Sequence, residues 1–389
     1  MRVIGLMAGT SLDGIDAAAI DVVQRDSALE VTPVATGTTP YPAELRDLLG
    51  RALPPQEVTA QDWCELDTRV GQAFAAAALE FATPLRPSAQ LVVSHGQTVF
   101  HWVEAGRVRG TLQAGQPAWI AEATGMPVVS DLRARDVAAG GQGAPLVSIF
   151  DVLWLRGRLG NPVALNLGGI ANLTADVHGE RPLAYDTGPA NALIDAAVTR
   201  ISRGELTFDE GGAVAARGRV DDALLEHLLA EPYYALPAPK STGKELFSAA
   251  YLERALLRRR PVKDDDLVAT LTALTARTVA DAALSHAPTA VVAAGGGTSN
   301  PTMMAMLAAA LADVPLVTAD SLGLPSGHKE AIAFAVLGFL TWNGLSATLP
   351  SATGARHASI LGTLTPGRAP LLLPPPMDVA PTHLVLKTP

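Results

Sequence analysis

The chain has 389 residues, of which 48% are hydrophobic, and its formal net charge is −9. This length suggests two domains with sizeable cores, and the negative charge argues against nucleic acid or an anionic membrane as the main partner. The single cysteine, Cys64, precludes an intrachain disulfide. No signal peptide is visible, and the apolar runs near 271–284 and 329–340 are short for a membrane span and contain polar residues. We therefore expect a cytoplasmic protein.

Strand-like and helix-like runs alternate along the chain, which is typical of an α/β protein. In the first half we expect strands at 2–7, 15–23, 30–38, 91–94 and 128–130, and helices at 42–53 and 59–82. The residues 140–143 are expected to form a glycine-rich loop.

A second half begins near residue 161 and repeats the opening design of strand, glycine turn and strand. In LAYDTGPANALIDAAVTRI we expect Asp186 to close a strand and Pro189 to begin a helix. The polar region 204–263 is expected to lie outside the sheet. The elements expected after it are a helix at 264–286, a strand at 290–294, a helix after Pro301, and then a strand, a loop and an apolar helix ending near 340.

The proline-rich tail beyond residue 366 is expected to be loosely attached. The glycine-turn hairpin near the start of each half is a weak internal repeat. It predicts two duplicated domains, 1–160 and 161–389, with a ligand cleft between them.

The first turn carries more polar groups than a hairpin requires. Glycine supplies the backbone angles of a tight turn, but GTSLDGID also contains Thr10, Ser11 and two aspartates. One interpretation is a decorated hairpin. The other is a loop whose N–H and hydroxyl groups hold phosphate, with the Asp13 carboxylate near Mg²⁺.

Familiar motifs do not account for the remaining polar turns. KSTGKE has no glycine five residues before Gly243 and has Glu245 where a P-loop needs Ser or Thr. AAGGGTSN lacks the last glycine of a dinucleotide fingerprint, and His95 with His101 lacks a second set of zinc ligands. Glycine turns nevertheless follow apolar strands at 9–14, 168–169, 188 and 295–297, which favours a nucleotide held across a cleft.

Eight ordered segments resemble the motifs of the anhydro-N-acetylmuramic acid kinase family. They are GLMAGTSLDGID, SHGQTVFH, SDLRARDVAAGGQGAPL, NLGGIANLT, DTGPANALID, PKSTGKELF, AAGGGTSNPTMM and KEAIAFAVLG, and LPSATGA extends the resemblance to residue 355. The resemblance implies the fold of the sugar kinase, heat-shock chaperone and actin superfamily, with one actin-like ATPase domain in each half. It also implies a homodimer.

The reaction that the resemblance implies belongs to the recycling of peptidoglycan sugar. ATP, water and 1,6-anhydro-N-acetylmuramic acid give N-acetylmuramic acid 6-phosphate and ADP. Because O6 of this sugar is bridged to C1 and carries no proton, the enzyme must open the bridge while it phosphorylates O6. A deprotonated water attacks C1, and O6 captures the γ-phosphoryl group.

We expect three turns to bind ATP and Mg²⁺. The first phosphate clasp consists of Gly9, Thr10, Ser11, Leu12, Asp13, Gly14, Ile15 and Asp16, with Asp13 holding the metal. The second clasp consists of Gly168, Gly169 and Asn172, and the adenosine turn of Gly295, Gly296, Gly297 and Asn300. The alternative for each glycine taken singly, and for Asp13, is a plain turn former.

Asp186 is the expected catalytic base, since an aspartate is ionised at neutral pH and its family position points to the same role. The alternative is that Asp186 caps the helix beginning at Pro189. Asp13 is the second expected catalytic residue, through its metal.

For the sugar we expect His95, Gln97 and Thr98, directly after a buried strand, and Arg133, whose guanidinium can bind the lactyl carboxylate with two bonds. Glu330 is a further candidate by family position. The alternatives are a closed turn for the first three, a surface salt bridge for Arg133, and a complement to the helix dipole for Glu330.

Three features are left open by the sequence. The loop of Lys240, Ser241, Thr242 and Lys244 contacts nucleotide, sugar or only solvent. Ala8 stands where the family usually has Ser, and SGHK precedes Glu330 where many relatives carry an Asp. Two other functions also remain: an ordinary sugar kinase acting on a free hydroxyl, and a nucleotide-switch protein that needs no sugar.

Overall fold

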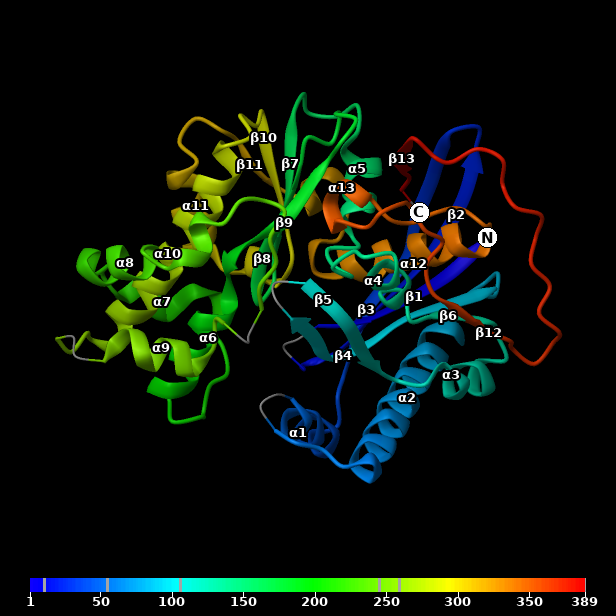
Figure 1. Ribbon diagram of the computed structural model, residues 1–389, viewed down its shortest axis with the longest axis horizontal. Helices are drawn as coiled ribbons and strands as arrows, with labels where there is room; N and C mark the ends of the chain where they lie inside the picture. The colour runs from blue at the N-terminus through cyan, green and yellow to red at the C-terminus, as the bar shows by residue number, and fades with distance from the viewer. Residues whose placement is uncertain (10–11, 54–55, 105–106, 244–245, 258–259, 389) are drawn as a thin grey trace. The chain divides into compact units, whose positions relative to one another are not determined.

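The computed structural model describes residues 1–9, 12–53, 56–104, 107–243, 246–257 and 260–388. The chain divides into two compact units. Figure 1 shows the chain coloured by residue number. Unit 1 comprises Met1–Arg156 and His328–Pro389, and unit 2 comprises Gly157–Gly327. Each unit contains one mixed sheet with helices, which confirms the predicted α/β class.

The sheet of unit 1 has the strand order β12-β6-β4-β1-β2-β3-β13, with β5 paired to β4. Its strands are β1 (Arg2–Ala8), β2 (Gly14–Arg25), β3 (Ala28–Pro40), β4 (Leu91–Glu104), β5 (Arg107–Ala114), β6 (Val128–Ser130), β12 (Thr363–Thr365) and β13 (His383–Leu386). Its helices are α1 (Ala43–Ala52), α2 (Ala60–Ala82), α3 (Pro117–Thr124), α4 (Ala134–Ala138), α5 (Ser148–Leu155), α12 (Lys329–Trp342) and α13 (Pro350–Thr353).

Helix α12 is apolar on nearly all sides and packs against β1, β2 and β4, as the orange helix in Figure 1 shows. Glycines permit this close approach. A Cβ atom at Gly5 would lie 2.1 Å from the Ala331 carbonyl oxygen, and one at Gly338 would lie 2.1 Å from the Val93 side chain. A helix that is hydrophobic on all sides is stable only inside a core, and this explains why α12 is buried in the core of unit 1.

The sheet of unit 2 has the strand order β11-β10-β7-β8-β9. Its strands are β7 (Pro162–Leu167), β8 (Ile170–Ala175), β9 (Leu183–Pro189), β10 (Ala290–Ala294) and β11 (Leu316–Thr318). Its helices are α6 (Asn191–Ile201), α7 (Ala213–Arg217), α8 (Asp222–Leu229), α9 (Ala249–Leu256), α10 (Asp264–Leu284) and α11 (Pro301–Ala310), and short 3-10 turns lie at 210–212, 232–235, 296–299, 319–322 and 326–328.

The two sheets share a topology. In unit 1, β1, β2 and β3 pair antiparallel in sequence, and β4 and β6 continue the sheet in parallel from β1. In unit 2, β7, β8 and β9 pair antiparallel, and β10 and β11 continue the sheet in parallel from β7. The internal repeat predicted from the two glycine-turn hairpins therefore extends to five strands in each unit.

Among the described residues, α10 is the one helix long and apolar enough to cross a membrane by length and composition. Within its most apolar window, 78% of the residues are buried inside the protein. Helix α10 packs against α6, α7, α8 and α11, so it is the core helix of unit 2.

Most predicted elements are confirmed to within a few residues, but three are wrong. Strand β4 continues to Glu104 because β5 pairs with its second half, so His95, Gln97 and Thr98 lie inside the strand. Asp186 and Pro189 both lie within β9, and α6 begins only at Asn191. Proline within a sheet is found mainly on edge strands, and β9 is an edge strand.

The third correction concerns the C-terminal segment. The tail is held in place, because β13 pairs in parallel with β3 and Leu384 is 2% exposed. The whole segment His328–Pro389 belongs to unit 1, whereas the sequence assigned it to the second half. The described part of 204–263 contains helices and turns and no strand, as expected for an excursion from the sheet.

Candidate active site

Three polar side chains line up across the antiparallel strands of unit 2. Asn166 of β7 pairs with Asn172 of β8, and Asn172 pairs with Asp186 of β9. Residues directly opposite one another on neighbouring strands lie on the same face of the sheet. All three are partly buried. Asn166 was not among the residues predicted from the sequence, although a lone polar residue in an apolar strand, two positions before the Gly168-Gly169 turn, is a signal of a site residue.

The Asp186 carboxylate is held by the loop that the sequence left unassigned. Its Oδ2 accepts hydrogen bonds from the Ser241 hydroxyl at 2.8 Å and from the Thr242 N–H at 2.9 Å. The Asp186 N–H donates to the Lys240 carbonyl oxygen at 3.0 Å. The helix-cap interpretation of Asp186 is wrong, because Ala190 occupies the N-cap of α6, with no side-chain cap.

The Gly168-Gly169 turn directs its carbonyl groups toward α6. The Gly168 oxygen accepts from the backbone N–H of Asn191 at 3.1 Å and from its Nδ2 at 2.8 Å, and the Gly169 oxygen accepts from the N–H groups of Ala190 and Ala192. Because the C=O and N–H of a trans peptide point in opposite directions, the Gly169 N–H points away from α6. This leaves the turn able to present an amide donor to an anion.

The Gly295 to Asn300 turn fits tightly over β7. Gly295 has φ 90°, and a Cβ there would lie 2.7 Å from Asn166 Oδ1, while one at Gly297 would lie 2.7 Å from the Leu167 side chain. Gly296 faces open space, so its backbone is accessible to a ligand. The Asn300 side chain accepts from the Met303 N–H at 2.9 Å and caps α11, which gives it a structural role.

In unit 1, the first glycine turn combines core and exposed residues. Leu12 and Ile15 are buried and Asp13 is exposed, whereas Thr10 and Ser11 lie outside the described residues. A Cβ at Gly14 would lie 2.6 Å from the Thr39 carbonyl oxygen, so packing against β3 requires this glycine. Ala8, at the family's usual Ser position, is buried.

Gln97 supports this turn from β4. It is 0% exposed, and its Nε2 donates to the Gly9 carbonyl oxygen at 3.1 Å while its Oε1 accepts from the Tyr41 hydroxyl at 3.2 Å. Thr98, which is partly buried, accepts a hydrogen bond from Gln113 at 3.2 Å.

Asp16 and His328 flank one threonine. The Thr38 hydroxyl donates to Asp16 Oδ1 at 2.6 Å, and Nε2 of His328 lies 3.4 Å from the same hydroxyl. Because the Thr38 hydroxyl donates its proton to Asp16, a hydrogen bond between Thr38 and His328 requires that Nε2 of His328 carry a proton and donate it. Burial raises the pKa of Asp16, and the Thr38 hydrogen bond acts in the opposite direction. The His328 imidazole of the SGHK segment thus lies beside the hydroxyl group that binds Asp16.

The buried His95 is hydrogen-bonded to the partly buried Arg133. The Arg133 Nε donates to His95 Nε2 at 2.8 Å, and its Nη1 donates to the Gly143 carbonyl oxygen at 2.6 Å. Nε2 of His95 is therefore an acceptor, and the proton is on Nδ1, which donates to the Gly96 oxygen at 2.8 Å. Burial, aided by the Arg133 charge, lowers the pKa of His95 well below its usual value. His95 is thus a neutral support that orients the guanidinium of Arg133.

Glu330 lies in the first turn of α12, next to a buried ion pair. Lys329 Nζ lies 2.6 Å from Asp151 Oδ1. Burial raises the pKa of Glu330, while the charges of Arg133 and Lys329 act in the opposite direction. Glu330 and Arg133 thus belong to one electrostatic neighbourhood in unit 1.

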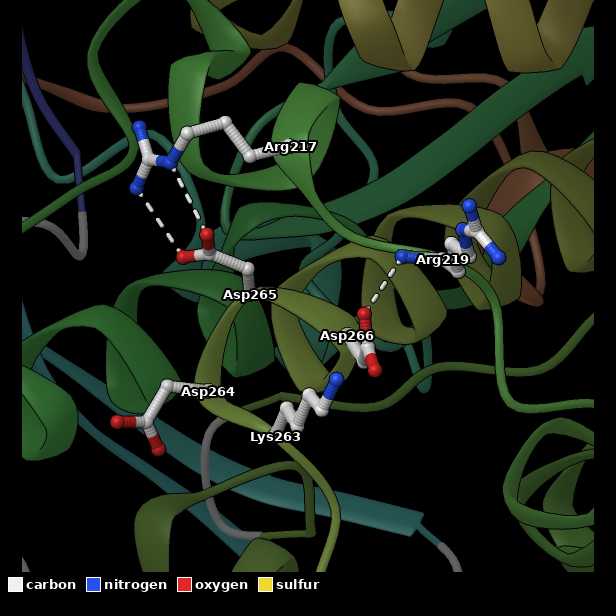
Figure 2. Close-up of a pocket in the computed structure, with 6 residues that line it drawn as sticks. All are labelled: Arg217, Arg219, Lys263, Asp264, Asp265 and Asp266. Carbon is white, nitrogen blue, oxygen red and sulfur yellow. Dashed lines mark hydrogen bonds and ion pairs between the residues drawn. The ribbon is translucent and has the colours of Figure 1, made fainter.

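A separate pocket of about 690 Å³ lies at the start of α10 in unit 2. Figure 2 shows its lining residues, with Arg217 paired to Asp265 and the Arg219 N–H bonded to Asp266. Its lining includes none of the predicted site residues that the structure describes. This pocket is therefore not part of the candidate site.

Comparison with known proteins gives consistent matches over the chain. The sequence model of the anhydro-N-acetylmuramic acid kinase family matches residues 1–367. The chain is 60% identical over 388 residues to the anhydro-N-acetylmuramic acid kinase of Streptomyces avermitilis, covering 100% of both chains. It is 60% identical over 375 residues to the enzyme of the same description from Rhodococcus erythropolis, covering 94% of each.

Among solved structures, the chain is similar to a ROK family glucokinase from Streptomyces griseus in complex with glucose and AMPPNP. The TM-score is 0.35 at 13% identity, covering 87% of this chain and 99% of that chain.

The sequence matches define the class of the protein, which is a phosphotransferase of the kinase type. Within that class, the chain belongs to the anhydro-N-acetylmuramic acid kinase family, and the prediction made from the eight ordered segments is confirmed.

Proposed function

We propose that the protein uses ATP and water to convert 1,6-anhydro-N-acetylmuramic acid into N-acetylmuramic acid 6-phosphate and ADP, in the recycling of peptidoglycan sugar. The observation that carries the proposal is the Asp186 carboxylate, fixed through Oδ2 by Ser241 and Thr242 in a chain of this family. A fixed carboxylate suits proton removal from a water molecule that attacks the sugar.

In the proposed reaction, Asp186 accepts a proton from the water whose oxygen bonds to C1 of the sugar. The C1–O6 bond breaks and its electron pair goes to O6. O6 then forms a bond to the γ-phosphorus, and the bond between this phosphorus and the bridging oxygen breaks to release ADP. Atoms and charges balance without any further acid, because O6 leaves as the phosphorylated oxygen.

We propose that three glycine turns contact ATP. The Gly9 to Asp16 turn and the Gly168-Gly169 turn with Asn172 would bind phosphate through N–H groups, and the Gly295 to Gly297 turn would lie against adenosine, with Asn300 acting through its cap of α11. The open space at Gly296 and the direction of the Gly169 N–H support this assignment.

Mg²⁺ would be held by Asp13. No group of three His, Cys, Asp or Glu side chains with metal-site geometry occurs in the part of the chain that the structure describes. A single exposed carboxylate still fits, because Mg²⁺ in kinases keeps several waters and is bound mainly by phosphate oxygens and one or two carboxylates. Bound there, the ion would neutralise charge on the transferred phosphoryl group.

We propose that Arg133 binds the lactyl carboxylate of the sugar. The bonds from Arg133 to His95 and Gly143 fix the guanidinium in advance, and this supports the assignment. His95 and Gln97 would act as supports, and Thr98 and Glu330 would contact hydroxyl groups of the sugar. We also propose that the protein acts in the cytoplasm as a homodimer, which sedimentation of the purified protein tests.

The test is ADP release by the purified protein with ATP and Mg²⁺, comparing 1,6-anhydro-N-acetylmuramic acid with free N-acetylmuramic acid. We expect turnover with the anhydro sugar alone, and a 6-phosphate product that carries one oxygen from ¹⁸O-labelled water at C1. Equal turnover with the free sugar would instead indicate an ordinary hydroxyl kinase. ATP binding without turnover of either sugar would indicate a nucleotide switch.

A further inference from the structure

We propose that Lys240, Ser241 and Thr242 form a positioning clamp that sets the orientation of the Asp186 carboxylate for proton transfer. This inference rests on the proposed function, in which Asp186 is the base. The clamp residues touch neither sugar nor nucleotide in this proposal, and they act on the reaction through Asp186.

The clamp grips both the side chain and the backbone of Asp186. Two consecutive residues, Ser241 and Thr242, direct one O–H and one N–H to the same oxygen, Oδ2. The carbonyl oxygen of the preceding residue, Lys240, accepts a hydrogen bond from the Asp186 N–H at 3.0 Å. Two hydrogen bonds to the carboxylate and one from the Asp186 N–H, all with one short segment, therefore fix the carboxylate relative to its own strand, which a single hydroxyl partner would not do.

Lys240 anchors the clamp to the body of unit 2. Its Nζ donates to the carbonyl oxygens of Tyr233 at 3.1 Å and Tyr234 at 3.0 Å, and lies 4.7 Å from the centre of the Tyr233 ring. An ammonium over an aromatic face is attracted by the ring. The Tyr233 hydroxyl donates to the Asp186 carbonyl oxygen at 2.7 Å. Asp186, Tyr233 and Lys240 are thus linked to one another in a closed ring of hydrogen bonds, which we call the circuit.

The circuit stands on a rigid aromatic platform. Tyr233 is 5% exposed and packs edge-on against Phe247, with ring centres 5.8 Å apart. Phe247 is completely buried and also contacts Tyr234 and Tyr251. Packed rings hold their rotamers, so movement of the clamp requires movement of the core of unit 2.

The expected effect of the clamp is on the chemical step. A misplacement of about 1 Å at a reacting group can cost roughly 100-fold in rate. Binding of the substrates does not depend on the clamp in this proposal. Its loss should therefore lower kcat and leave the KM values for sugar and ATP close to those of the wild type.

The experiment compares steady-state kinetics of Ser241→Ala, Ser241→Thr and Lys240→Met with those of the wild type. We expect Ser241→Ala to lower kcat by roughly 10- to 100-fold with little change in KM, Ser241→Thr to restore most of kcat through its hydroxyl, and Lys240→Met to resemble Ser241→Ala. The matched control is Ser248→Ala, which removes the N-cap bond of α9 to the Tyr251 N–H and leaves Asp186 untouched.

A double variant separates this proposal from the proposed function. In the Asp186→Asn background, Ser241→Ala should cost less than about 2-fold further, because residues that act as a unit are not additive. Wild-type kcat in Ser241→Ala, or an equal loss in both backgrounds, would overturn the clamp while leaving Asp186 as the base. Wild-type turnover in Asp186→Asn would overturn the proposed function itself. Because Ser241 is exposed, Ser241→Ala tests the clamp even if Lys240→Met does not fold.

Discussion

Two duplicated sheets carry different polar groups at the same strand positions. In each unit, three residues lie opposite one another across the first three strands, just before the turn that joins the first strand to the second. In unit 1 they are Met7, Asp16 and Thr38. In unit 2 they are Asn166, Asn172 and Asp186. The carboxylate of unit 1, Asp16, therefore lies on the second strand, β2, whereas that of unit 2, Asp186, lies on the third strand, β9. One shared topology therefore presents an acid at two different places.

The partners of the two carboxylates differ as well. Asp16 is bonded by one hydroxyl of the neighbouring strand, that of Thr38. Asp186 is bonded by Ser241 and Thr242, which belong to the excursion 204–263 that interrupts the second repeat. An insertion, and not the repeated sheet, therefore supplies the groups that bind the carboxylate of the proposed base.

The largest expected effect distinguishes the two carboxylates. Asp186→Asn should lower kcat by about 10²- to 10⁴-fold, because an amide cannot accept the proton from water, while KM changes little. Asp16→Asn should give a smaller loss that appears mainly in the KM for ATP. Asp281→Asn, at an exposed carboxylate of unit 2, is the control. A larger kcat loss for Asp16→Asn than for Asp186→Asn would reverse the comparison.

The glycine turns should respond differently to an added methyl group. Gly14→Ala places a Cβ 2.6 Å from a backbone oxygen, and we expect it to destabilise unit 1 by ~1–3 kcal/mol. Gly168→Ala has its nearest neighbour at 3.4 Å, so its stability should be kept while the KM for ATP rises, if phosphate approaches this turn. Thermal unfolding and steady-state kinetics of both variants measure the two effects. An unchanged KM in Gly168→Ala would remove that turn from the phosphate site.

The smallest effect concerns the stability of unit 1 as a function of pH. The pKa of Glu330 is raised above its usual 4.5 by burial, so ionisation of this group favours the unfolded chain. The wild type should therefore lose stability relative to Glu330→Gln as the pH rises from below 4.5 through the raised pKa, and the difference should then stay constant. Urea unfolding between about pH 4 and about pH 8 measures it, with the exposed Glu122→Gln as control. A difference that does not change with pH would refute the raised pKa.

The amino-acid sequence alone predicted the α/β class, most of the strands, the longer helices and the family. It did not predict β5, β12 and β13 or the shorter helices α3, α4, α5, α7, α8, α9 and α13. Strand-forming apolar runs are local signals, and they located β1, β6 and β10 to within about one residue. The family followed from eight segments in order, each of which is local in the chain. Asp186 was singled out in the same way, although its position within β9 was not.

Tertiary structure decided the partners of these residues, because the partners come from distant parts of the chain. The loop at 240–242 meets Asp186 some 55 residues away, and no local pattern distinguishes it from a loop facing solvent. His95 became a neutral support only because Arg133, 38 residues later, donates to it in a buried place. The C-terminal segment belongs to unit 1 because the largely apolar helix α12 packs against β1, β2 and β4 and the strand HLVL pairs with β3. The strands β1, β2 and β3 lie at the opposite end of the sequence.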